Sequence, residues 1–368
     1  MKVNRVELFH IRMPLVHYFE TSFEKTNARD CIIVKIFGTN EVGYGEVVVS
    51  STPFYSYETV ETAWHVLKEF IIPIILNHKL KTIEELAERL APIRGHNMAK
   101  AGVEEALFDI FAKLQDIPMS KAIGGTRERI EVGVSIGIQD SVKHLIGRIE
   151  HFLAQGYRRI KVKIKPGWDI DVVKQIRKTF RSIPLMVDAN CAYTLEDMDI
   201  FKSLDDFDLM MIEQPLAYDD MVDHAELQKE IRTPVCLDES INSFAAARTA
   251  IELGSCKIIN IKAGRVGGLL NAKKVHDLCR ENDIPVWCGG MLETGIGRAH
   301  NIALASLPNF VLPGDISDSR RYYEEDIIKP PIEVQKDGTI EVSKEVGLGF
   351  SVLDEMINKF CLRKESFP

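Results

Sequence analysis

The chain has 368 residues, 45% of them hydrophobic and 27% charged, which is enough to bury a large core and leave room for a second domain. Its net charge of −8, without a basic stripe, argues against a nucleic acid partner. The apolar runs are too short to cross a bilayer, Met1–Asn4 begins no signal peptide, and the cysteines form no Cys-x-x-Cys pair, so we expect a cytoplasmic protein without a membrane partner.

Residues 1–125 predict an α+β capping domain at the N-terminus. Weak alternation of polar and apolar residues indicates a first strand, and two further apolar runs flank Gly38-Thr39-Asn40 as the arms of a hairpin. Helical periodicity follows in three stretches. The expected strands are Val3–Pro14, Asp30–Phe37 and Glu41–Val49, and the expected helices are Tyr57–Leu76, Thr82–Leu90 and Met98–Leu114.

Residues 126–318 predict a catalytic (β/α)-barrel domain. Short runs rich in β-branched residues recur about every 25 residues, a spacing that suits one strand, one helix and two short connections. Eight such runs point to a barrel in which the carboxyl ends of the strands share one rim. The expected strands are Glu131–Ile136, Arg159–Ile164, Pro184–Asp188, Leu209–Glu213, Pro234–Asp238, Lys257–Lys262, Ile284–Cys288 and Asn309–Pro313.

The last segment, residues 319–368, is expected to return to the capping domain and extend its sheet. Within it, Pro331–Val342 carries Asp337-Gly338 at its centre, which is the strongest short signal for a hairpin.

Five ionisable residues end five consecutive barrel strands. They are spaced 25, 25, 25 and 24 residues apart, and unrelated surface charges are the less favoured explanation because buried charges need a partner or a metal ion. On a barrel these side chains converge at one rim. The five residues are Lys163, Asp188, Glu213, Asp238 and Lys262.

Three of these residues predict a metal site. Asp188, Glu213 and Asp238 offer hard oxygen donors without histidine or cysteine, which suits Mg²⁺, or Mn²⁺ in its place, rather than zinc. Asn190 and Glu239 lie nearby and are candidates to orient the ligands, although solvated loop residues are nearly as good an explanation.

The lysines predict proton transfer. Lys161 and Lys163 project to the same face of their strand, while Lys262 stands on the opposite side of the ring. A dication nearby is expected to lower a lysine's pKa, so that it acts as a general base. Two lysines on opposite faces suit a racemase, and one suffices for an elimination.

Five strings carry a family resemblance. They are Lys161-Val162-Lys163, Val187-Asp188-Ala189-Asn190, Ile212-Glu213-Gln214-Pro215-Leu216, Leu237-Asp238-Glu239-Ser240 and Asn260-Ile261-Lys262. With them the chain resembles the enolase superfamily, specifically its muconate-lactonizing-enzyme subgroup. Longer strings such as Gly289-Gly290-Met291-Leu292-Glu293-Thr294 resemble the o-succinylbenzoate synthase and N-succinylamino acid racemase family.

The resemblance implies a fold and an activity. The fold is a modified TIM barrel, (β/α)7β, with the capping domain completed by the C-terminal tail. The activity is the Mg²⁺-dependent syn dehydration of 2-succinyl-6-hydroxy-2,4-cyclohexadiene-1-carboxylate in menaquinone biosynthesis, together with racemisation of N-succinyl or other N-acylamino acids. Relatives assemble as homo-oligomers, dimers or octamers, and act on small carboxylates.

The resemblance also implies roles for the polar residues. Lys163 abstracts the α-proton and returns a proton to the leaving hydroxyl. Lys262 stabilises the enediolate and is the opposite-face acid or base in racemisation, and Lys161 tunes Lys163. Arg265 resembles a residue that tunes the second lysine in racemase-competent members, but an ordinary loop salt bridge explains it equally well. Glu239 is expected, like Arg265, to tune the residues that bind the metal ion or transfer protons.

Substrate-binding positions follow by the same analogy. Phe19, Phe23 and Tyr55 are expected to wall the acyl arm, although such aromatic residues are commonly packing anchors. Ser135 and the backbone near Gly290 and Met291 are expected to bind the distal carboxylate of the substrate, and Asn190 is a further expected substrate-binding residue.

Several alternative functions remain open. A dedicated N-acylamino acid racemase shares every residue named above. A dipeptide epimerase is expected to carry an Asp-x-Asp pair after the eighth strand, which Gly314–Asp318 lacks. A sugar-acid dehydratase usually needs a late histidine, where this chain has Trp287-Cys288. From another class, a non-catalytic binding protein on this fold is disfavoured because all five charged residues are present.

Overall fold

Seven parallel strands form the central sheet of a computed structural model that describes residues 1–368. Their order follows the chain, from β5 to β11, and every neighbouring pair is parallel. The strands are β5 (Val134–Ile136), β6 (Ile160–Lys163), β7 (Leu185–Asp188), β8 (Ile212–Glu213), β9 (Val235–Leu237), β10 (Ile258–Ile261) and β11 (Val286–Cys288).

The segment after Asn309 closes the sheet into a barrel. Phe310 bridges to Val286 of β11, and Gly314 bridges to Val132, just before β5, so the segment has a parallel neighbour on each side. No regular eighth strand forms, because these pairings are isolated bridges. The expected modified barrel, (β/α)7β, is therefore confirmed, with its last strand reduced to a closing segment.

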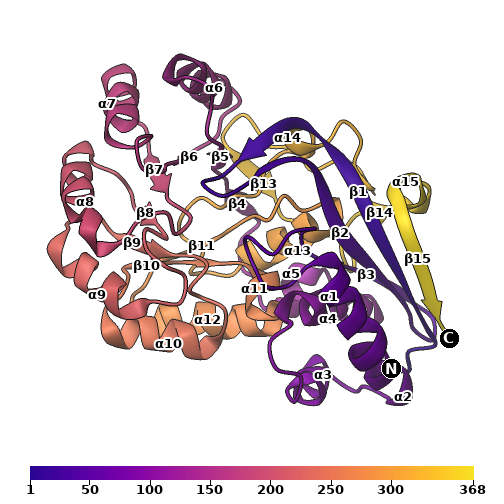
Figure 1. Cartoon of the computed structure of the whole chain (residues 1–368). Coiled ribbons are helices and arrows are strands. Elements are labelled where there is room, and N and C mark those ends of the chain that lie inside the picture. The colour runs from indigo at the N-terminus through magenta and orange to yellow at the C-terminus, as the bar shows by residue number, and fades with distance from the viewer.

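Helices lie on the outside of the barrel, with at least one after each of its seven strands (Figure 1). They are α6 (Val142–Ala154), α7 (Ile170–Thr179), α8 (Met198–Leu204) between η2 (Leu195–Asp197) and η3 (Asp205–Phe207), α9 (Met221–Glu230), α10 (Phe244–Leu253), α11 (Ala263–Val266), α12 (Leu269–Glu281) and α13 (Gly295–Ala305).

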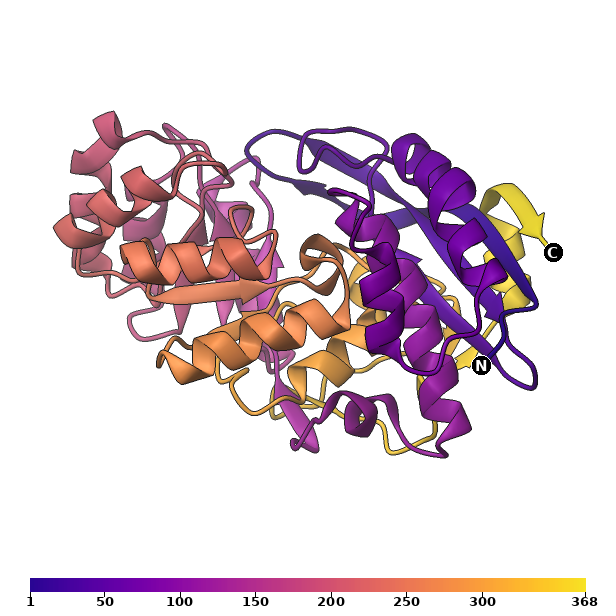
Figure 2. The ribbon, with the colours of Figure 1, turned by 90° about the horizontal axis from the view of Figure 1, so that it is seen from below.

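A second, antiparallel sheet has four strands in the order β15-β1-β2-β3. Its strands are β1 (Arg5–Glu20), β2 (Lys25–Phe37), β3 (Val42–Val47) and β15 (Cys361–Phe367). The pairing of β15 with β1 confirms that the C-terminal tail extends the N-terminal sheet, and both termini lie at the same end of the molecule (Figures 1 and 2).

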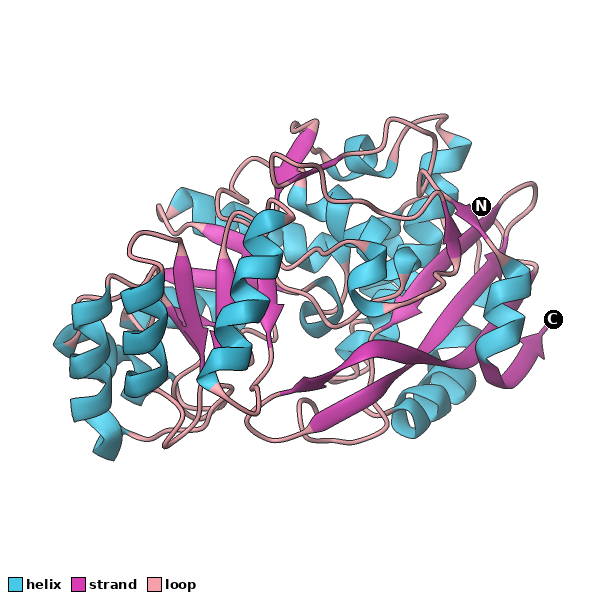
Figure 3. Ribbon diagram, turned by 90° about the horizontal axis from the view of Figure 1, so that it is seen from above, coloured by secondary structure: helices cyan, strands magenta, loops and turns pink.

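Helices of the N-terminal region pack against this sheet and against one another. They are α1 (Val60–Val66), the π-helical η1 (Leu67–Ile71), α2 (Ile72–Asn77), α3 (Ile83–Leu90) and α4 (Asn97–Leu114). The three expected helical stretches are all present, and α1, η1 and α2 together fill the first. The long α4 contacts β3 on one side and α11 and α12 of the barrel on the other, so it joins the two regions (Figures 2 and 3).

The remaining short elements come directly before the barrel or belong to the C-terminal segment. They are α5 (Met119–Ile123), β4 (Arg129–Glu131), α14 (Ser319–Tyr322), β12 (Ile328–Lys329), β13 (Thr339–Glu341), β14 (Ser351–Val352) and α15 (Asp354–Phe360).

The expected hairpin at Pro331–Val342 is only partly right. The chain does turn at Asp337-Gly338, but residues 331–335 form no strand, and β13 pairs with β4 at the barrel instead. Pro331 begins the first arm and Pro330 precedes it, and neither can donate a ladder hydrogen bond. No helix of the structure combines the length and the apolar character that a membrane span requires. The domain boundaries near residues 125 and 318 stay predictions.

Candidate active site

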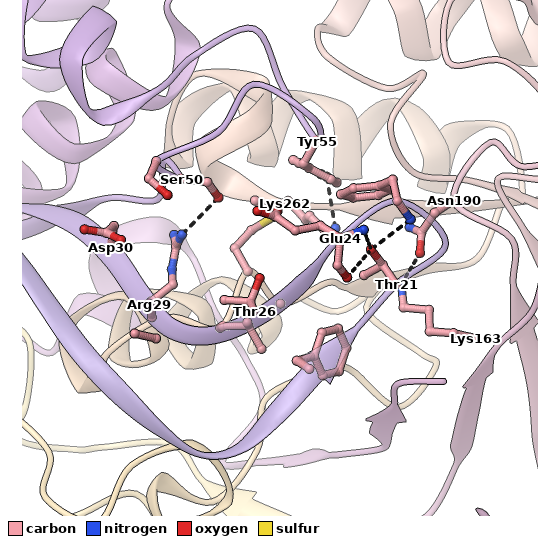
Figure 4. A pocket seen from close by; sticks show the side chains of 17 residues that line it. Thr21, Glu24, Thr26, Arg29, Asp30, Ser50, Tyr55, Lys163, Asn190 and Lys262 are labelled. Atoms are coloured by element: carbon pink, nitrogen blue, oxygen red, sulfur yellow. Dashed lines mark hydrogen bonds between the residues drawn. The ribbon is translucent and has the colours of Figure 1, made fainter. Parts of the chain in front are cut away.

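Lys163 and Lys262 come from opposite parts of the barrel sheet to one cavity of about 120 Å³ (Figure 4). Lys163 ends β6, and Lys262 follows β10 directly. Both ammonium groups are nearly buried. Both lysines therefore line one cavity, as expected from charged residues that end successive barrel strands.

The cavity brings together most of the expected substrate-binding residues. Of these, its lining contains Phe19, Phe23, Tyr55, Asn190, Gly290 and Met291. The aromatic rings come from the N-terminal region: Tyr55 stands with its ring centroid 4.7 Å from the Nζ of Lys262, and Phe19 lies 5.9 Å from the Nζ of Lys163. The capping domain thus supplies the wall opposite the barrel rim.

Each lysine is held by a carboxylate at a neighbouring strand end. Lys163 donates to Asp188 Oδ2 and to Asn190 Oδ1, both at 2.6 Å. Lys262 donates to Asp238 Oδ2 at 2.7 Å and to the Tyr55 hydroxyl at 3.0 Å. These contacts fix the two ammonium groups in place.

Lys161 is the most enclosed of the three lysines. Its Nζ lies 2.8 Å from Glu213 and from Asp315 and 3.2 Å from Asp188. Burial alone would lower the pKa of Lys161, but Asp315, Glu213 and Asp188 together raise it above its usual value. Lys161 therefore carries a fixed positive charge beneath the cavity and does not line it.

The carboxylates respond to these lysines. Burial raises the pKa of Asp188, but Lys163 and Lys161 outweigh it and hold that pKa below its usual range. Burial and the adjacent Asp188 raise the pKa of Glu213. Burial also acts to lower the pKa of Lys262, yet neighbouring groups led by Tyr55 and Glu239 raise it. The protein's own groups therefore act on Lys161 and Lys262 in the direction opposite to that expected of a dication.

Arg265 and Glu239 lie beside the second lysine. The Arg265 guanidinium donates to Tyr55 at 3.2 Å and pairs with Asp238, so it contacts both partners of Lys262. Glu239 accepts a 2.9 Å hydrogen bond from Asn190, and its second oxygen is buried without a partner. These contacts agree with the salt-bridge explanation of Arg265, and its tuning role stays a prediction.

Two family models match the chain. Residues 5–124 match the mandelate racemase / muconate lactonizing enzyme N-terminal domain, and residues 145–356 match the enolase C-terminal domain-like family. The chain belongs to the enolase superfamily.

Relatives and a solved structure agree with this membership. The chain is 53% identical to an o-succinylbenzoate synthase of Geobacillus kaustophilus, covering 98% of this chain and 96% of the relative. It is 47% identical to an N-succinylamino acid racemase of Thermus thermophilus, covering 95% and 94% of the two chains. A crystal structure of an enolase superfamily member from Listeria innocua matches with a TM-score of 0.96 and 42% identity over 100% and 99% of the two chains.

In this superfamily member, the three expected metal ligands lie on adjacent strands. Asp188 and Glu213 are direct register partners, and Asp238 follows β9, the next strand. The donor set of fully buried carboxylates fits a hard divalent cation. The side chains turn toward lysines and Arg265, however, and no three histidine, cysteine, aspartate or glutamate side chains gather closely enough to hold a metal ion. The ligand assignment stays a prediction.

Strained backbone follows the strand ends that carry these groups. Asn190, Cys191 and Gln214 adopt φ values of 45°, 65° and 38° in the left-handed region. Gln214 then accepts hydrogen bonds from the backbone amides of Asp238 at 2.9 Å and Ser240 at 3.2 Å. Gln214, which the sequence did not single out as a site residue, therefore fixes the end of β9 that presents Asp238.

Asp315 is the main site residue that sequence reasoning missed. It follows the closing segment of the barrel, is buried, and accepts a 2.7 Å hydrogen bond from Ser135 besides pairing with Lys161 and Arg159. It follows a segment that forms no regular strand, and it stands outside the 25-residue spacing that marked the other strand-end carboxylates. Ser135 consequently lies beneath the cavity, bonded to Asp315, and is absent from the cavity lining. Asn260, which donates to Glu213 at 2.8 Å, was also missed.

Proposed function

We propose that the chain is an o-succinylbenzoate synthase that also racemises N-succinylamino and other N-acylamino acids. The observation that carries the proposal is the pair Lys163 and Lys262, which reach one cavity from β6 and from the end of β10. The relatives named above support the substrate class, since both activities begin with loss of a proton α to a carboxylate.

We assign Asp188, Glu213 and Asp238 as ligands of Mg²⁺, which Mn²⁺ or another divalent cation can replace. The bound cation supplies Lewis-acid stabilisation of negative charge on the substrate carboxylate. Asn190 and Glu239 orient this set through the 2.9 Å hydrogen bond between them.

Lys163 performs the proton transfers of the dehydration. Its neutral amine takes the α-proton of 2-succinyl-6-hydroxy-2,4-cyclohexadiene-1-carboxylate, and the resulting ammonium gives a proton to the departing hydroxyl on the same face. Water leaves and the ring becomes aromatic. Lys262 remains an ammonium that faces the developing negative charge, and Lys161 holds positive charge beneath it.

Racemisation uses both lysines as acid and base. Lys163 removes the α-proton from one face of an N-acylamino acid, and Lys262 delivers a proton to the other face, or the reverse. Arg265 and Tyr55 position Lys262 for this step through their shared contacts.

The acyl arm occupies the part of the cavity lined by the capping domain. Phe19, Phe23 and Tyr55 supply its apolar walls, while Gly290 and Met291 border it from the barrel. Ser135 reaches a substrate group only if it releases Asp315, so we place it as a support of that carboxylate. The tight cavity, about 120 Å³, calls for the capping loops to move when substrate enters.

The test is the ratio of kcat/KM for dehydration to that for racemisation of N-succinyl-phenylalanine, measured on purified protein with Mg²⁺. A large ratio identifies a synthase with incidental racemisation, and comparable values identify a bifunctional enzyme. A ratio far below one favours a dedicated racemase. Absence of both reactions overturns the proposal, makes dipeptides the next substrates, and revives the non-catalytic alternative if they also fail.

Stereospecific exchange assigns the two lysines. Lys163→Ala is expected to abolish dehydration and racemisation, whereas Lys262→Ala abolishes racemisation. In D₂O, each single variant is expected to lose the capacity to abstract the α-proton from one enantiomer of N-succinyl-phenylalanine. Near-native racemase turnover in either variant would contradict the two-base mechanism.

We also propose that the chain is cytoplasmic, with domains at residues 1–125, 126–318 and 319–368. We propose further that it assembles as a homo-oligomer, a dimer or an octamer. The exposed apolar side chains of Phe54 and Val222 provide surface for association. Light scattering during size-exclusion chromatography measures the assembly, and a monomer would contradict it.

A further inference from the structure

A second cavity lies away from the candidate active site, where α6, the C-terminal part of β1 and the segment around α14 meet (Figure 1). Its volume is about 380 Å³. Six of its lining residues carry basic side chains: His17, Arg148, His151, Arg320, Arg321 and Lys336. The one carboxylate of the lining, Asp318, accepts hydrogen bonds from the backbone amides of Arg320 at 2.9 Å and Val334 at 3.3 Å.

Three of the four arginine and lysine side chains in this lining have no acidic partner. Arg320 pairs with Glu333 at 2.8 Å, but Arg148, Arg321 and Lys336 make no ion pair. The Arg148 guanidinium also makes no hydrogen bond. Arg321 donates from Nη2 to the backbone oxygen of Ser135 at 3.2 Å, and its Nε is buried without a partner. Guanidinium donors thus remain unused at the cavity.

An aromatic ring holds the two central arginines in place. The guanidinium carbon of Arg148 lies 4.8 Å from the centroid of the Phe152 ring, and that of Arg321 lies 4.9 Å from the same centroid. Phe152 itself is buried, with 2% of its surface exposed. Contact with a ring face stabilises a guanidinium while its N–H groups, which lie at the edges of the plane, stay free to donate.

The gathered positive charge is unfavourable without a counter-ion. Burial and then Arg321 lower the pKa of Arg148, and burial followed by Arg148 and Arg321 lowers the pKa of His17. A smaller neighbouring cavity is lined by the same His17, Arg148 and Arg321 and also by His144. The basic lining therefore continues from the 380 Å³ cavity into this neighbour. An anion placed between the two arginines would relieve this repulsion.

We propose that this cavity binds a small phosphate-bearing anion, with Arg148 and Arg321 donating to the phosphate oxygens and His17 and Lys336 at its edge. Paired guanidinium groups match the geometry of phosphate oxygens. One water takes up about 30 Å³ in the liquid, so a cavity of about 380 Å³ exceeds a lone phosphate and has room for the organic part of a phosphate ester. The site is independent of the proposed dehydration and racemisation.

Isothermal titration of the full-length protein with inorganic phosphate, and separately with phenyl phosphate, tests the site in a Tris chloride buffer containing Mg²⁺. We expect saturable binding with one site per chain, not reproduced by sodium chloride of equal ionic strength. Tighter binding of phenyl phosphate identifies an ester site, and equal binding identifies a site for the phosphate group alone. Absence of saturable binding for both probes overturns the proposal.

Variants separate this site from the active site. Arg148→Gln is expected to weaken phosphate binding by about 10-fold to 100-fold, as for loss of a charged donor, whereas Arg320→Gln, whose guanidinium is engaged by Glu333, changes it little. Lys163→Ala is expected to keep native phosphate affinity. Loss of binding in Lys163→Ala with retention in Arg148→Gln would assign the phosphate to the active site and overturn the proposal.

Charge reversal at Arg148 tests whether a loss of phosphate binding comes from misfolding. Arg148→Glu places a carboxylate beside Arg321, so we expect it to abolish phosphate binding while its melting temperature in phosphate-free buffer equals or exceeds that of the unaltered protein. Addition of phosphate is expected to raise the melting temperature of the unaltered protein only. An equal rise in Arg148→Glu would contradict the site.

Discussion

The ammonium of Lys262 donates a 3.0 Å hydrogen bond to the hydroxyl of Tyr55, which joins the end of a barrel strand to a loop of the N-terminal region. Arg265 donates to the same hydroxyl at 3.2 Å. One phenolic oxygen thus accepts from two cations on the barrel. The position of the loop and the position of the proposed second base are therefore coupled.

Tyr55→Phe isolates that hydroxyl, because the ring is kept against Lys262. Hydrogen bonds to charged groups contribute about 1.5–3 kcal/mol, so we expect racemase kcat/KM to fall by about 10-fold to 100-fold. Steady-state kinetics with both enantiomers of N-succinyl-phenylalanine measures the loss. Tyr218→Phe is the matched control, since Tyr218 is exposed. Equal kinetics in the two variants would show that the hydroxyl does not position Lys262.

Asp238→Asn tests the metal assignment. The substitution keeps the shape of the side chain and removes one negative charge from the proposed ligand set, so we expect the Mg²⁺ concentration for half-maximal activity to rise by at least about 10-fold. Asp315→Asn is the matched control, because Asp315 is also buried and contacts Lys161 but is not among the proposed ligands. Titration of activity with Mg²⁺ measures both. An unchanged requirement in Asp238→Asn would remove it from the set.

The barrel and its charged rim were predictable because strand-end charges follow a fixed spacing. Each of the five charged residues ends a strand or directly follows one, and the predicted strands start and stop close to the observed ones. The closing segment around Phe310 was also found, although it forms isolated bridges, because its apolar run resembles a strand.

Contacts that depend on three-dimensional convergence were not predictable in the same way. Asp315 follows the least regular strand, so no rhythm marked it, and the backbone role of Gln214 depends on a positive φ. The partner of β13 was misjudged because an Asp-Gly turn fixes a reversal of the chain, not the strand that it will pair with. The pairing of β13 with β4 arises from tertiary packing.

Glu46→Ala tests the junction between the N-terminal sheet and the barrel. The fully buried Glu46 carboxylate, on β3, accepts from the hydroxyl of Thr294 at 2.6 Å and from the backbone amides of Thr294 and Gly297 at 3.0 and 3.1 Å. Removing it leaves these donors unsatisfied at the start of α13, so we expect a loss of about 2–4 kcal/mol in the free energy of unfolding. Urea denaturation measures it, with exposed Glu355→Ala as the control. A loss no larger than in the control would contradict this role.

Glu104→Gln tests a buried carboxyl that opposes stability at high pH. Glu104 on α4 reaches the start of α12 so closely that a Cβ at Gly268 would lie 1.9 Å from its Oε2. Burial raises the pKa of Glu104 from 4.5 to about 8, against the backbone hydrogen bonds of Leu269 and Leu270. The folded state therefore binds more protons than the unfolded state between these two pH values, and stability falls as pH rises through that window.

The difference in free energy of unfolding between Glu104→Gln and the unaltered protein is therefore expected to grow as pH rises. At pH 5 the carboxyl is protonated in the folded state and has only begun to ionise in the unfolded state, so Glu104→Gln is expected to change the free energy of unfolding by less than about 1 kcal/mol at that pH. At pH 9 the unaltered protein has lost roughly 3–5 kcal/mol through this group, at about 1.4 kcal/mol per pH unit, and the neutral amide has not. Urea denaturation from pH 5 to pH 9, with exposed Glu84→Gln as the control, should give curves that diverge with pH only for Glu104→Gln. Parallel curves for all three proteins would show that the carboxyl is ionised throughout this range, held by the amides at the start of α12.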